Sequence, residues 1–155
     1  MKQKDSAVQF APMEELMPLI RESLAAGQTV RFSPRGVSML PMLRQGKDAV
    51  EFSPLPRQLK KYDLPIYRYP NGKYVMHRIV GVTEDGFLCL GDNTYSPERV
   101  SGEQMLAVVS AFRRGDRWIP VTDPGYRLYC RLWCGCYPLR RFAKRAVNWL
   151  RRHLR

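Results

Sequence analysis

The chain of 155 residues has 26 lysines and arginines against 14 acidic residues, a net charge of +12. This length suits one domain with a buried core. The charge is uneven, because residues 126–155 hold nine lysines and arginines and no acid, so a nearly neutral domain is followed by a cationic tail. No apolar run approaches the roughly 18 residues of a membrane-spanning helix, and the polar N-terminus indicates no signal peptide.

The cysteine pattern argues against a disulfide framework and against a structural zinc site. The four cysteines are Cys89, Cys130, Cys134 and Cys136. Three of them lie within seven residues of the tail, without a fourth ligand and without the CxxC pairing that zinc sites favour. We therefore expect free thiols in a reducing compartment, no metal and no organic cofactor.

The first predicted element is a helix that begins near Pro12 and ends at Gly27, within an N-terminal helical segment of residues 1–28. Strands are then expected over residues 29–32 and 48–52. Between them, Gly36 permits a positive φ and Pro41 fixes φ and lacks a donor, so the chain must bend sharply. Ser38 lies on this bend.

The middle of the chain has the pattern of an antiparallel meander. Residues 62–69 predict a strand, for which Pro65 favours an edge position. Asn71-Gly72 is the strongest hairpin signal in the chain, and it folds that strand back on residues 73–82. Further strands are expected over residues 87–90, 105–112 and 118–121, with turns at residues 84–86 and 114–116.

The β pattern ends at Pro124, and two helical pieces are expected over residues 126–136 and 139–154, separated by Pro138. The second piece has one apolar face, and basic residues occupy the rest of its circumference. We assign residues 29–122 to a β-rich domain and residues 123–155 to a basic amphipathic helical tail. The Ser38 bend precedes this tail, so we expect the site to survive removal of everything after Pro124.

Three polar residues beside the β-segments are candidates for a nucleophile, a base and an orienting acid: Ser38, His77 and Asp92. His77 alternates with Val75 and Ile79, so it is expected to point toward the buried face. Each residue also has an ordinary interpretation, as a loop serine, a satisfied core histidine and a turn aspartate.

Taken together, these stretches resemble the signal peptidase I and LexA-like superfamily of serine peptidases. The similarity keeps its order over about residues 29–112, and the matching segments are residues 36–43, 45–50, 62–64, 77–82 and 91–93. Main-type bacterial signal peptidases and LexA-like repressors use a lysine base, whereas the archaeal, endoplasmic-reticulum and sporulation type uses a histidine. His77-Arg78-Ile79 is similar to the histidine branch.

The resemblance implies a mainly β (α+β) fold of twisted sheets, with Ser38 as the acylated nucleophile, His77 as the general base and Asp92 as the acid. Glu98 is the alternative acid, because the histidine branch commonly has a second acid several residues after the Gly-Asp-Asn segment. Gly36 stands where some members have a serine or threonine that helps the oxyanion hole. The backbone N–H of Ser38 must then contribute more of that stabilisation.

We therefore expect a serine endopeptidase similar to signal peptidase I, which cleaves an extended leader- or signal-like segment of a protein or peptide. The alternatives are a catalytically weak regulatory or binding module of the same fold and a self-cleaving repressor-like protein. The histidine base and the lack of a preceding DNA-reading domain disfavour the repressor.

The cationic tail admits three interpretations: a solvated face packed on the domain, a segment that binds an anionic membrane surface, and a nucleic-acid-binding segment. Its lack of acids favours the membrane surface over nucleic acid. We expect a cytoplasmic protein that is peripheral on the membrane.

Overall fold

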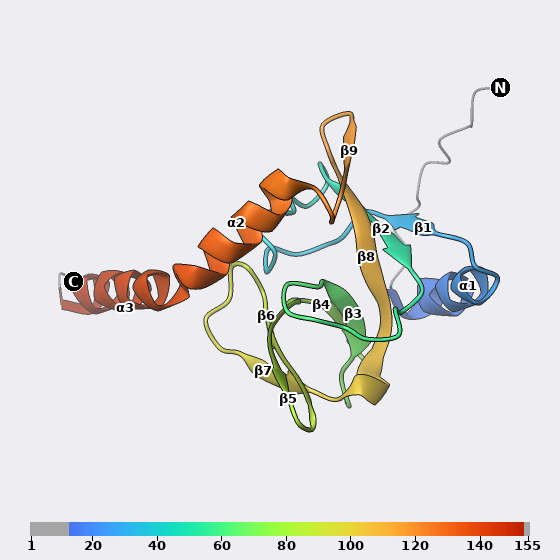
Figure 1. Ribbon diagram of the computed structural model, residues 1–155. Coiled ribbons are helices and arrows are strands. Elements are labelled where there is room, and N and C mark those ends of the chain that lie inside the picture. The colour runs from blue at the N-terminus through green and yellow to red at the C-terminus, as the bar shows by residue number, and fades with distance from the viewer. Residues whose placement is uncertain (1–12, 154–155) are drawn as a thin grey trace.

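The computed structural model describes residues 13–153 as an α+β structure with two antiparallel sheets (Figure 1). The helices are α1 (Met13–Ala25), α2 (Pro124–Gly135) and α3 (Tyr137–His153), with a 3-10 turn, η1 (Gly102–Gln104). The strands are β1 (Val30–Phe32), β2 (Ala49–Ser53), β3 (Pro65–Arg68), β4 (Tyr74–Met76), β5 (Arg78–Thr83), β6 (Gly86–Leu90), β7 (Glu98–Val100), β8 (Met105–Arg114) and β9 (Arg117–Pro120). The expected helix start at Pro12 lies outside the described residues.

The expected α+β class is confirmed, but the structure is less dominated by β than expected, because helical and strand residues are present in nearly equal amounts. The difference comes mostly from the C-terminal part, where α2 and α3 together form 29 residues of regular helix. The meander and the N-terminal helix lie where the sequence pattern predicts them.

The larger sheet has the order β1-β2-β8-β3-β4, and β9 folds back on β8. Alternate residues of its strands face one core, which includes Val50, Phe52, Ile66, Ala107 and Val109. Helix α1 closes this core with Met17, Ile20 and Leu24, the apolar positions of its inner face.

The smaller sheet has the order β5-β6-β7. Its first strand, β5, begins at Arg78, and one residue separates it from β4 of the larger sheet, which ends at Met76. The predicted single strand over residues 73–82 is in fact two strands, β4 in the larger sheet and β5 in the smaller, with His77 between them. The Asn71-Gly72 turn joins β3 to β4 as expected, and Gly72 has a φ of +89°. The break therefore places His77 at the junction of the two sheets.

Two other details differ from the sequence-based expectation. Strand β3 is interior, since β8 and β4 pair with its two sides, so Pro65 does not mark an edge strand. Pro65 is instead the first residue of β3, a position where a missing N–H is tolerated. Strand β7 was not predicted, because three residues are too few to show a period.

The two C-terminal helices differ in how they relate to the rest of the chain. Asp123 caps α2 by accepting a hydrogen bond from the Tyr126 N–H at 2.8 Å, and Pro124 follows in the first turn. Helix α2 buries Tyr126 and Cys130 in the main core. Helix α3 buries no residue and extends away from the sheets (Figure 1). Within residues 13–153, no helix is both long and apolar enough to cross a bilayer.

Candidate functional site

The Ser38 bend is a short turn that packs against the core. Gly36 adopts a φ of +93°, as the sequence predicted, and its N–H donates to Gln45 Oε1 at 2.7 Å. The Leu43 N–H donates to the Met39 carbonyl oxygen at 2.9 Å, which closes one helical turn directly after Ser38. Met39 and Leu43 are both buried. The half-buried Ser38 is therefore held on a fixed support.

The loop after β6 clamps the other side of this bend. The Asn93 N–H donates to the Ser38 carbonyl oxygen at 2.7 Å, and Asn93 Nδ2 donates to the Val37 carbonyl oxygen at 3.1 Å. Gly91 lets the segments approach, because a Cβ there would lie 2.7 Å from the Ser38 carbonyl oxygen and 3.1 Å from His77 Cδ2. Gly91 and Asn93 thus bring the Ser38 bend and the histidine ring together.

His77 is oriented by Glu98, the first residue of β7. Its Nδ1 lies 2.6 Å from Glu98 Oε1, and the His77 side chain is 12% exposed. Since Glu98 accepts this hydrogen bond, the proton belongs on Nδ1, and Nε2 keeps the lone pair that a general base needs. The ring's Cδ2, which borders Nε2, lies beside Gly91, and Gly91 in turn lies against the Ser38 carbonyl oxygen.

Two tyrosine hydroxyls complete the environment of the Glu98 carboxylate. Tyr67 donates to Oε1 and Tyr69 donates to Oε2. Burial by itself would raise the pKa of Glu98, but the hydrogen bonds from Tyr67, Tyr69 and His77 together hold that pKa below its usual value. Burial, reinforced by Glu98, raises the pKa of both tyrosines, so they stay neutral donors. Glu98 is therefore a carboxylate with three donors, one of which is His77.

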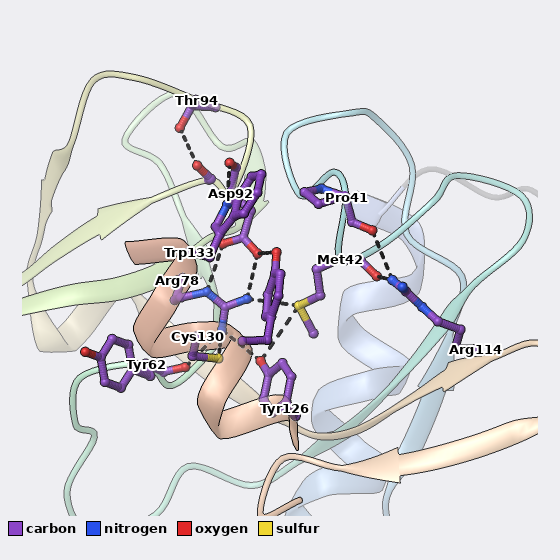
Figure 2. Close-up of polar contacts among 12 residues, drawn as sticks. Pro41, Met42, Tyr62, Arg78, Asp92, Thr94, Arg114, Tyr126, Cys130 and Trp133 are labelled. Carbon is purple, nitrogen blue, oxygen red and sulfur yellow. Dashed lines mark hydrogen bonds and ion pairs between the residues drawn. The ribbon is translucent and has the colours of Figure 1, made fainter. Parts of the chain in front are cut away.

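Asp92 does not contact His77, and its expected role as the orienting acid is corrected here. Its two carboxylate oxygens accept hydrogen bonds from Arg78 Nε and Nη2, each at 2.8 Å, and Tyr129 donates to Oδ2 at 2.8 Å (Figure 2). His77 and Arg78 are neighbours in the chain, so their side chains leave the backbone on opposite sides. His77 reaches Glu98, while Arg78 reaches Asp92.

The Arg78 side chain is fully buried, which the sequence did not predict. Around it lie Asp92, the Tyr126 hydroxyl at 2.8 Å, Cys130 Sγ at 3.0 Å and Met42 Sδ at 2.9 Å (Figure 2). Burial opposes the charge on Arg78, but the hydrogen bond to Asp92 raises the pKa of the guanidinium well above its usual value. The result is a buried ion pair directly beside the candidate base.

This ion pair also joins α2 to the site. Tyr126 and Cys130 of α2 surround Arg78, and Trp133 Nε1 donates to the Asp92 backbone carbonyl oxygen at 2.9 Å. Removing everything after Pro124 would uncover the ion pair next to His77 and Asn93. The expectation that the Ser38 site survives such a truncation therefore needs revision, because α2 packs into the core of the domain.

Ser38 and His77 line the same cavity, which has a volume of about 260 Å³. It lies between the end of β1 and the edge strand β4, and its walls combine apolar and polar residues. Among the lining residues are Phe32, Pro34, Met39, Tyr69, Val75 and Met76. Ser38, the His77–Glu98 pair and this cavity are therefore adjacent.

The described residues offer no comparable centre for metal or thiol chemistry. Within residues 13–153, no three histidines, cysteines or acids are grouped closely enough to bind a metal ion. Burial raises the pKa of the Cys89 thiol to about 12, and burial also raises the pKa of Cys130 and Cys134. These three thiols are poor nucleophiles at neutral pH. A search of protein-family models and of curated proteins finds no match to this chain.

Proposed function

We propose that this protein is a serine endopeptidase in which Ser38 is the nucleophile, His77 the general base and Glu98 the acid that orients His77. The observation that carries the proposal is the Nδ1–Oε1 contact of 2.6 Å between His77 and Glu98. The ring's Cδ2 lies beside Gly91, which in turn lies against the Ser38 carbonyl oxygen. A histidine that served only packing would not need a hydrogen bond to a carboxylate that two tyrosines also hold in place. This constellation has the roles and order of a catalytic triad.

The chemistry follows from these positions. As Ser38 Oγ attacks the scissile carbonyl carbon, His77 Nε2 takes the hydroxyl proton, and Glu98 stabilises the resulting imidazolium. The tetrahedral intermediate collapses when His77 returns that proton to the leaving amine. A water, deprotonated by His77, then attacks the acyl-enzyme ester, and the proton goes back to Ser38 Oγ. The backbone N–H of Ser38 is the expected donor to the oxyanion.

The form of the cavity favours an extended substrate. β1 and β4 are the two ends of the larger sheet, and both border the cavity. An extended peptide can pair with an edge strand through its backbone and place alternate side chains on one face. Apolar walls formed by Phe32, Val75 and Met76 suit an apolar side chain at one of these positions. A leader- or signal-like segment has this character.

The test is reaction with a fluorophosphonate probe, followed by mass spectrometry of the labelled peptide. We expect the label on Ser38, with no labelling of Ser38→Ala and a rate lowered by a factor on the order of 10³ or more in His77→Ala. Ser96→Ala, which changes an exposed serine in the β6–β7 loop, serves as the control and should label normally. An unlabelled wild-type protein would overturn the proposal and favour a binding module. Fragments of this chain appearing during incubation alone would favour self-cleavage.

A further inference from the structure

Helix α3 presents an apolar face that no part of the described chain covers. Every residue from 141 to 153 is exposed. With Ala143 and Ala146 between the larger side chains, apolar positions recur every three or four residues from Leu139 to Leu150, so they lie on one side of the helix. The large ones, with their exposed fractions, are Leu139 (70%), Phe142 (72%), Val147 (48%), Trp149 (59%) and Leu150 (49%). A water-exposed stripe of this size indicates a surface that something else covers.

The rest of the circumference of α3 is cationic. Six basic residues flank the stripe: Arg140, Arg141, Lys144, Arg145, Arg151 and Arg152. No aspartate or glutamate occurs anywhere after Asp123, so α3 has no ion pairs of its own. Basic residues three and four apart repel one another along a helix, and an external anion would relieve that repulsion.

The base of α3 is fixed to the domain, and the remainder projects from it. Arg140 Nη1 donates to the Asp92 carbonyl oxygen at 2.8 Å, and the Tyr137 hydroxyl donates to the Tyr95 carbonyl oxygen at 2.6 Å. Lys144 Nζ lies 4.0 Å from the centre of the Tyr95 ring. The helix has 17 residues and is about 25 Å long, and it extends from the sheets as an arm (Figure 1). An arm held in this way can reach a surface without disturbing the core.

We propose that α3 lies in the interface of an anionic lipid bilayer and holds the domain at the membrane surface. A lipid surface covers the apolar stripe with acyl chains and at the same time meets the flanking cations with headgroup phosphates. Trp149 adds an indole, which favours the headgroup region. This proposal concerns α3 alone, so it stands or falls independently of the peptidase chemistry.

Two other occupants fit the charge or the stripe, but not both. A second copy of α3 would cover the stripe, but it would bring two cationic helices without acids side by side. Nucleic acid would neutralise the cations, but it would leave Leu139, Phe142 and Trp149 in water. The lipid surface is the occupant that both covers the apolar stripe and neutralises the cationic face of α3.

The test is co-sedimentation of the full chain with vesicles of phosphatidylglycerol and phosphatidylcholine, compared with phosphatidylcholine alone. We expect binding to the anionic vesicles only, and release by added salt. The triple variant Phe142→Ser/Trp149→Ser/Leu150→Ser should weaken binding by a factor on the order of 100 or more, because membrane affinity scales with buried apolar area. The variant Arg141→Gln/Arg145→Gln should weaken it by a factor on the order of ten.

Matched controls test whether vesicle binding depends on α3 specifically, and not on any exposed apolar residue or any positive charge. Leu19→Ser removes a 62% exposed leucine from α1, and Arg117→Gln removes an exposed charge from the first residue of β9; neither should change vesicle binding. Because α3 buries nothing, the triple variant should keep the wild-type melting temperature and Ser38 labelling. Unchanged vesicle binding by the triple variant would overturn the proposal. So would tighter binding to double-stranded DNA than to the vesicles, or a dimer in sedimentation analysis that the triple variant abolishes.

Discussion

Asp92 and Glu98 occupy different environments, and replacing each by its amide should separate stability from activity. Asp92→Asn removes the charge that balances Arg78, whose side chain is 0% exposed and cannot turn to water. Breaking a buried ion pair from one side costs about 3–5 kcal/mol. For a domain of this size, each kcal/mol lowers the melting temperature by about 2–4 °C, so the expected drop is about 6–20 °C.

The matched control for this prediction is Asp48→Asn. The Asp48 side chain is also fully buried, and it pairs with Arg44 at 2.8 Å, but the Arg44 side chain is 42% exposed. Water can hydrate Arg44 once its partner is neutral, so the drop in melting temperature should be clearly smaller. Calorimetry or circular dichroism at neutral pH gives both values. If Asp92→Asn melts no lower than Asp48→Asn, the reasoning about the Arg78 ion pair is wrong.

The remaining predictions concern the site itself. Glu98→Gln should lower the rate of Ser38 labelling by a factor on the order of 10³–10⁴ with a smaller change in melting temperature than Asp92→Asn; a labelling rate within tenfold of wild type would contradict its role. Gly91→Ala should impair both labelling and stability, because its Cβ would lie 2.7 Å from the Ser38 carbonyl oxygen, whereas Gly102→Ala, with nothing within 4 Å, should be neutral. The pKa of Glu98 is lower in the folded protein than its reference value of 4.5, since hydrogen bonds from Tyr67, Tyr69 and His77 outweigh the effect of burial. The carboxylate therefore stabilises the fold above that reference pH, and this contribution is lost as the pH falls through the lowered pKa. The difference in unfolding free energy between wild type and Glu98→Gln, measured by denaturant titration, should shrink over that acid range; a difference that stays constant would contradict it.

The parts of the site that depend on local chemistry could be predicted from the sequence. The positive φ of Gly36 and the Asn71-Gly72 hairpin each follow from what one or two residues permit. The position of His77 could be predicted only in part. The alternating pattern continues through this residue and does not show that β4 and β5 belong to different sheets. Such a change depends on which strands pair, and pairing partners lie far apart in the sequence.

The contact of His77 with Glu98, where the sequence favoured Asp92, has the same origin. Asp92 is part of the Gly-Asp-Asn signature itself, whereas Glu98 reaches His77 only because β7 pairs with β6 in one register. The burial of Arg78 depends on Met42, Asp92 and Tyr126, which come from three distant segments. A charged residue in a strand predicts a solvent-facing position unless its partners are known. Long-range partners are the information that one sequence lacks.

The contact between α2 and the Arg78–Asp92 pair has a consequence for the order in which the protein becomes functional during synthesis. A nascent chain that has emerged only as far as β9 already contains Ser38, His77 and Glu98. It lacks Tyr126, Cys130 and Trp133, so Arg78 remains open to water and the loop that clamps Ser38 has no backing from α2. The proposed Ser38 site therefore has its full packing only after α2 docks, which requires the chain through Trp133 to have left the ribosome.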